Sequence, residues 1–137
     1  MRRSRRQAPD RVRQGIGKKL AAAFRYDLKR KGHDEWIAKL AAEFPDEFPP
    51  GTVPVRPAEA KTEAWHAFYL RAWQALRFDR QYFAFGGQTP ISFMALDGYA
   101  RRYGIEGEAF ERFLAFMNQI DDEWLEYAAQ DSKAADA

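Results

Sequence analysis

The chain has 137 residues, of which 46% are hydrophobic and 15% aromatic, enough apolar side chain for one folded domain with a single core. It contains no cysteine, which excludes disulfides, thiol catalysis and cysteine-ligated metals, and no apolar run approaches the ~20 residues that span a membrane. The net charge of +2 is unevenly spread, because residues 1–31 carry twelve Lys and Arg against two Asp, whereas the rest of the chain carries ten against eighteen Asp and Glu.

Residues 1–13 form a basic arm that we expect to be flexible, because its start has no apolar anchor. No apolar signal core follows it, so we expect a cytoplasmic protein. The charge of the arm continues into the first predicted helix and suits either the phosphates of a nucleic acid or an acidic protein surface. No aromatic residue interleaves with it, so base stacking is not expected. The residues that would make such a contact are Arg2, Arg3, Arg5, Arg6, Arg11, Arg13, Lys18 and Lys19.

Residues 14–44 are predicted to form a pair of helices. The first has an apolar residue at every fourth position, and we expect Gly32 to end it. The second is short and covers residues 35–44. Its inward-facing residues are expected to be Trp36, Ile37, Leu40 and Phe44.

Five prolines lie within residues 45–57, which forbids a continuous helix and favours an extended crossing. This segment is either a linker between two units or a strap over the core. We favour the strap, because Phe48, Val53 and Val55 would otherwise have no apolar contacts.

Residues 58–129 are predicted to form a three-helix unit, followed by a flexible tail at 130–137. The first of its helices covers about 58–81, and the last runs from about Glu108 to Ala129 with apolar residues on one face. The expected fold is therefore all-α, a small bundle of about five helices with a proline-rich strap between the second and third. Its expected core cluster is Trp73, Leu76, Phe93, Leu96, Phe113, Met117 and Trp124.

The central helix of this unit is bracketed by glycines. Gly86 and Gly87 are expected to make a sharp interhelix turn through positive φ. Thr89 then suits the N-cap of a helix that starts at Pro90, and Gly104 suits its C-terminal stop. Apolar residues surround most of this helix, which predicts that it is buried. These residues are Ile91, Phe93, Met94, Leu96 and Tyr99.

No catalytic residue, metal ligand or cofactor site is expected. Glu63 and His66 have a spacing known from metal-binding bundles, but the motif occurs once, so we interpret it as a surface carboxylate beside a half-buried histidine. We interpret residues 121–123 as a solvated acidic face, and the charged residues of 77–80 as local ion pairs.

The pieces of the three-helix unit follow one another in a characteristic order. They are a tryptophan-bearing helix at Trp73, Gly86-Gly87-Gln-Thr89, Leu96-Asp-Gly-Tyr99, Gly104-Ile105, and an amphipathic helix from Phe110 to Leu125. This order, over about residues 65–128, resembles a family of small α-helical proteins encoded among the tail genes of tailed bacteriophages. The family usually has Gly-Leu where this chain has Pro90-Ile91, and the basic N-terminal third lies outside the resemblance.

The resemblance implies a non-enzymatic tail-assembly chaperone or virion-assembly adaptor in the host cytoplasm. Proteins of this kind hold tail or tape-measure segments before polymerisation, so the implied partner is a tail or other virion protein. The alternative is a small nucleic-acid-binding or regulatory protein that uses the basic arm and the first helix.

Overall fold

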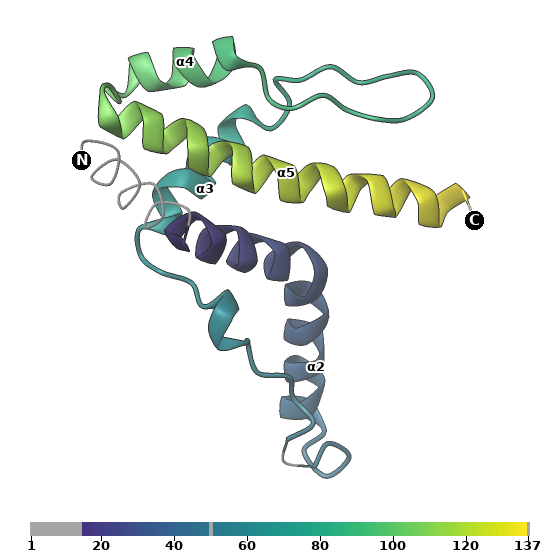
Figure 1. The fold of residues 1–137 in the computed structure, drawn as a ribbon. Helices are drawn as coiled ribbons and strands as arrows, with labels where there is room; N and C mark the ends of the chain where they lie inside the picture. Colours follow the sequence, from purple (N-terminus) through teal and green to yellow (C-terminus); the bar gives the residue numbers. More distant parts are fainter. Residues whose placement is uncertain (1–14, 50, 137) are drawn as a thin grey trace, which may run out of the picture.

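The computed structural model describes residues 15–49 and 51–136, and Figure 1 shows that these residues fold into helices joined by loops. No strand occurs among them, so the prediction of an all-α fold is confirmed. None of the described helices is long and apolar enough to cross a membrane. In chain order the elements are an N-terminal helix (residues 15–26), η1 (Asp27–Lys31), α2 (Gly32–Glu43), η2 (Ala58–Ala60), α3 (His66–Leu76), α4 (Phe93–Arg102) and α5 (Glu108–Asp136).

The N-terminal helix continues through η1 into α2, and the expected stop at Gly32 is wrong. Gly32 has φ −62° and ψ −41°, which is ordinary right-handed helix. Instead of ending, the helix passes through a π-turn, a local widening that commonly accompanies a change of helix direction. Figure 1 shows the chain bending here, so that α2 leaves in a new direction.

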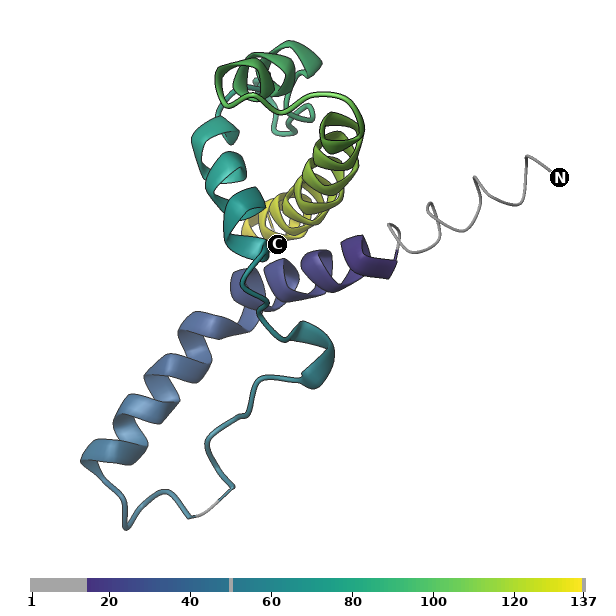
Figure 2. The ribbon, with the colours of Figure 1, turned by 90° about the vertical axis from the view of Figure 1, so that its left-hand side faces the viewer.

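We call α2 and residues 44–57 the projecting limb, because Figures 1 and 2 show both segments extending away from the other helices. Trp36 is 58% exposed and Phe44 51% exposed, so the prediction that both point inward is wrong. Val55 is also exposed, so the proline-rich segment does not bury it against the core as predicted. The physical reason is the bend at η1, which carries α2 beyond the helices against which its apolar face was expected to pack.

The core lies in what we call the body, formed by the N-terminal helix, α3, α4 and α5. Phe24 packs edge-on against Trp73 with ring centroids 4.9 Å apart, and Tyr99 stacks on Phe113 at 5.7 Å. Gly17 is buried against α5, where a Cβ would overlap the side chain of Gln119. The buried cluster comprises Leu20, Phe24, Tyr69, Ala72, Trp73, Leu76, Ile91, Leu96, Ala100, Phe113, Phe116, Met117 and Ile120.

The described part of the chain covers helix α4 on one side only. Leu96 and Ala100 are buried, whereas Phe93 is 60% exposed and Met94 is more exposed still. The expected burial of Phe93 and Met94 is therefore wrong, while Trp124 packs against the cluster as a half-buried residue. A helix that is apolar on most sides does not have to be enclosed, because a domain of this size has too few elements to surround it.

Two predicted helix boundaries shift for local reasons. Ser92, not Thr89, caps α4, since its Oγ accepts a hydrogen bond from the Ala95 N–H at 3.1 Å. The predicted helix over 58–81 is reduced to η2 and α3, which ends at Leu76. The chain then forms the loop described below.

The C-terminal end of α4 also follows from local geometry, whereas α5 runs further than expected. Gly104 has φ +67°, and the Ile105 N–H donates to the Ala100 carbonyl at 2.8 Å, which are features of a Schellman stop. Helix α5 continues to Asp136, whereas we expected it to end at Ala129 and leave a flexible tail.

Candidate functional site

Residues 81–89, which we call the aromatic loop, form a closed loop between α3 and α4. The Thr89 N–H donates to the Gln81 carbonyl at 2.9 Å, and the Gln81 N–H donates to the Thr89 hydroxyl at 2.8 Å. Tyr82 and Gln88 then form an isolated antiparallel bridge. These contacts hold the two ends of the loop together and let its tip extend outward.

Two glycines reverse the chain at the tip of the aromatic loop. Gly86 has φ +91° and Gly87 has φ +96°, values that side chains with a Cβ rarely adopt. The Gly86 N–H donates to the Phe83 carbonyl, and the Phe83 N–H donates to the Gly87 carbonyl, each at 3.1 Å. The turn therefore presents the intervening aromatic residues outward.

The aromatic loop is an apolar surface. Phe85 is fully exposed, and Tyr82 and Phe83 are each more than half exposed. The sequence from Gln81 to Leu96 contains no Asp, Glu, Lys, Arg or His. Adjacent exposed aromatic residues without nearby charge are typical of a surface that binds another apolar surface.

A cleft of about 500 Å³ lies between the aromatic loop and the C-terminal half of α5. Its volume is in the usual range of binding clefts. Among the described residues that line it, only Lys133 is charged, so the cleft offers apolar contact rather than acid–base chemistry. The lining consists of Tyr82, Phe83, Phe85, Gly86, Gly87 and Gln88 from the loop, and Leu125, Ala128, Ala129, Ser132 and Lys133 from α5.

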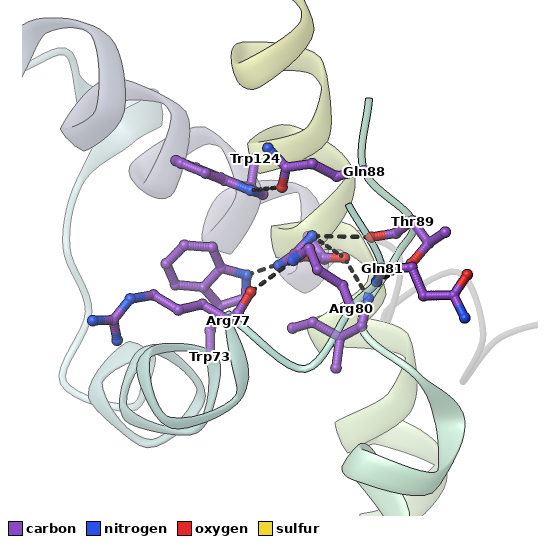
Figure 3. A network of polar contacts seen from close by, with 9 residues as sticks. Trp73, Arg77, Arg80, Gln81, Gln88, Thr89 and Trp124 are labelled. Atoms are coloured by element: carbon purple, nitrogen blue, oxygen red, sulfur yellow. Dashed lines mark hydrogen bonds and ion pairs between the residues drawn. The ribbon is translucent and has the colours of Figure 1, made fainter. Parts of the chain in front are cut away.

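A buried polar network fixes the base of the aromatic loop to α5 (Figure 3). Asp121 is only 3% exposed, and it accepts from Arg80 Nη2 at 2.6 Å. The same carboxylate accepts from Trp73 Nε1 at 3.1 Å and from the Ile91 N–H at 3.0 Å. One side chain of α5 thus binds α3, the start of the loop and the segment that leads into α4.

This network corrects two predictions. Asp121 is not part of a solvated acidic face, because its carboxylate is enclosed and fully used by three donors. Arg80 does donate locally, to the Arg77 carbonyl at 2.6 Å, but its ion pair is with Asp121, far along the chain. The burial of both charges is tolerated because each has several hydrogen-bond partners.

A second contact holds the other end of the loop. Trp124 Nε1 donates to Gln88 Oε1 at 3.0 Å, as Figure 3 shows. The aromatic loop is therefore attached to α5 through both its start and its end, whereas Phe85 at the tip remains exposed. A fixed base and an exposed tip let the loop present its aromatic residues without reorganising first.

Most of the predicted basic contact residues, Arg2, Arg3, Arg5, Arg6, Arg11 and Arg13, lie outside the described residues. Lys18 and Lys19 are exposed on the N-terminal helix. Lys18 lies beside acidic residues of α5 in a shallow groove that also contains Arg25, Asp122 and Glu123. Arg25 Nε donates to Glu123 Oε2 at 2.7 Å. Although Asp122 is exposed, partial desolvation by its neighbours, together with the charges of Asp121 and Glu123, raises the pKa of its carboxyl. The described part of the predicted basic surface is therefore mixed in charge.

The histidine of the Glu63 and His66 motif lies in the interior of the body. His66 is fully buried, not half-buried as expected, and its Nδ1 accepts from the Glu63 N–H at 3.2 Å. Burial lowers the pKa of His66, which favours the neutral imidazole. Within the described ranges, no group of three or more His, Asp or Glu side chains is placed to hold a metal ion.

Sequence reasoning located the Gly-Gly turn but missed the cleft. The long uncharged run around Phe83 and Phe85 is the signal in the sequence that could have indicated an exposed binding loop. Nothing in the sequence distinguishes Asp121 from Asp122, because adjacent helical residues differ in burial only through what packs on them.

A comparison with protein families agrees with the resemblance seen in the sequence. A family model described as phage tail assembly chaperone matches residues 52–126, which is more than half of the chain. The match includes α3, the aromatic loop, α4 and most of α5. Neither a curated protein nor a solved structure matches the chain.

Proposed function

The chain belongs to the phage tail assembly chaperone family, and from that premise we propose that it holds an apolar segment of a tail protein in the cleft beside the aromatic loop. The observation that carries this proposal is the exposed Tyr82, Phe83 and Phe85 above an apolar face of α5. This binding takes place in the host cytoplasm, before the tail polymerises.

The chemistry of the cleft suits a holding role. Aromatic side chains supply much of the energy of protein–protein contacts, because they bury a large area and lose little conformational freedom. The lining is mostly apolar, with Lys133 as its one charged residue among those described, so it favours apolar surface over a particular charge pattern. Such binding covers segments that would otherwise associate early, and it requires no catalytic group.

A co-production experiment tests this proposal. The tape-measure protein of the same phage is produced with the wild-type chain or with the double variant Phe85→Ser, Leu125→Glu, and its soluble fraction and co-purification are measured. We expect the double variant to bind the tape-measure protein at least about tenfold more weakly. One substitution removes an aromatic side chain that would be buried in the complex, and the other places a charge in the cleft.

The matched control is Phe78→Ser. Phe78 is 70% exposed but does not line the cleft, so its replacement should leave binding unchanged. Far-UV circular dichroism checks that each variant keeps its helices. Equal binding by wild type and double variant would exclude the cleft as the holding site.

The alternative function is tested by deleting residues 1–13, which removes six Arg and one Asp. If the chain holds tail segments in the cleft, this deletion leaves binding of the tape-measure protein intact. If the chain binds nucleic acid through the arm, the deletion weakens DNA binding and flattens its salt dependence, since each lost phosphate contact lowers the slope by about one. Titration of the full-length chain and of the chain without residues 1–13, with duplex and single-stranded DNA at two salt concentrations, separates the two functions.

A further inference from the structure

We propose that two copies of this chain pair through their projecting limbs, with the two α2 helices antiparallel. This pairing is independent of the cleft, and it would place two clefts on one particle. The proposal is carried by the apolar face and the charge layout of the limb.

The described residues leave much of the apolar face of α2 exposed. Trp36, Leu40 and Phe44 are spaced four residues apart, so they lie along one side of the helix. Trp36 and Phe44 are more than half exposed and Leu40 is partly exposed. Figures 1 and 2 both show α2 extending away from the body, so the body's own helices leave this side of α2 uncovered.

Exposed basic residues lie next to the base of the limb, and exposed acidic residues lie at its tip. Lys29, Arg30 and Lys31 are all exposed in η1, the segment that leads directly into α2. Glu43, Asp46 and Glu47 are all exposed at its tip. The twelve residues of α2 separate these groups by about 18 Å. This separation exceeds the screening length of about 8 Å at physiological salt. The fields of the basic and the acidic group therefore do not cancel, and a partner meets each group separately.

A second copy is the occupant that matches this layout. A two-fold axis near the middle of α2 sets the basic base of each copy against the acidic tip of the other. The same operation brings Trp36 and Leu40 of both copies together at the centre. A partner of one charge sign would attract one end of the limb and repel the other.

The size of the limb sets the strength of the pairing. Two twelve-residue helices bury less than the roughly 1,200 Å² of a standard stable interface. The dimer is therefore reversible, and its charged ends make it weaken as salt is added.

Analytical ultracentrifugation of the full chain over a wide range of concentration tests this proposal. We expect a monomer–dimer equilibrium that weakens at high salt. Trp36→Glu should weaken association by at least about tenfold, because a charge is placed at the centre of the contact. The matched control is Phe93→Glu, which changes a similarly exposed aromatic residue of the body and should leave the equilibrium unchanged.

Charge reversal gives the sharper test. A base variant carries Lys29→Glu, Arg30→Glu and Lys31→Glu, and a tip variant carries Glu43→Lys, Asp46→Lys and Glu47→Lys. Each variant alone should be monomeric, because like charges then face one another, whereas an equal mixture should form a heterodimer. Circular dichroism checks that both stay helical. A full chain that is monomeric throughout, a dimer indifferent to Trp36→Glu, or variants that fail to pair when mixed would each overturn the proposal.

Discussion

The body and the projecting limb each contain a polar side chain that joins segments distant in the sequence, and the two side chains differ in their exposure to water. In the body, Asp121 is 3% exposed and joins α5 to Trp73, Arg80 and Ile91. At the root of the limb, Arg56 joins the proline-rich segment to the first residue of η1. Its Nη1 donates to Asp27 Oδ1 at 2.8 Å, although the two side chains are 27% and 29% exposed.

Arg56 has further partners that keep the limb in position. Its Nε donates to the Ala60 carbonyl at 2.5 Å, and its guanidinium lies 4.5 Å from the centre of the Tyr26 ring. Asp121 and Arg56 therefore both have several contacts, but water reaches only Arg56. Burial, rather than the number of partners, then decides how far the free energy of unfolding falls when a charge is removed.

The largest expected effect is the loss of the buried carboxylate. Asp121→Ala leaves the Arg80 guanidinium buried without its counter-charge, and should lower the free energy of unfolding by about 3–5 kcal/mol. Asp27→Ala removes the partner of Arg56 where solvent can replace it, and should cost about 0–1 kcal/mol. Urea denaturation of both variants measures the difference. Equal losses would contradict the contrast between body and limb.

An apolar truncation tests the same contrast without charge. Leu96→Ala creates a cavity in the buried cluster and should cost about 2–5 kcal/mol. Trp36→Ala removes an exposed side chain of the limb and, at concentrations where the chain is monomeric, should change stability by no more than about 0.5 kcal/mol. The measurement is again urea denaturation, monitored by circular dichroism. A large loss from Trp36→Ala in the monomer would mean that the limb packs against the body.

The smallest expected effect is a pH dependence at His66, which follows the proline-rich segment at the start of α3. Its pKa is lowered by burial, so the unfolded chain binds the proton more readily than the folded chain. Stability should therefore fall as pH drops below the ordinary histidine value of about 6.5, with a slope of at most about 1.4 kcal/mol per pH unit.

Removing the imidazole tests this assignment. His66→Leu should flatten the slope between about pH 7.5 and 5.5. Denaturation curves across this range provide the measurement. An unchanged slope in His66→Leu would assign the pH dependence to another group.

Particular residues show how far sequence reasoning reaches. Periodicity identified the inward faces of α3 and α5, so Trp73, Leu76, Phe113 and Met117 are buried as predicted. The same reasoning failed at Trp36, because it assumes that every apolar face has a partner in the same chain. The cleft was missed because it forms between a loop and a helix that are distant in sequence.

The sequence by itself determined the all-α fold, the family, the positions of most helices in the body and the glycine-rich turn, because helical period and glycine chemistry act over a few residues. Only the tertiary structure decided that α2 leaves the body, that Asp121 is buried while Asp122 is exposed, and that Phe85 faces solvent beside a cleft. These features depend on which surfaces meet after the chain has folded, and burial is a property of the assembled elements rather than of any one of them.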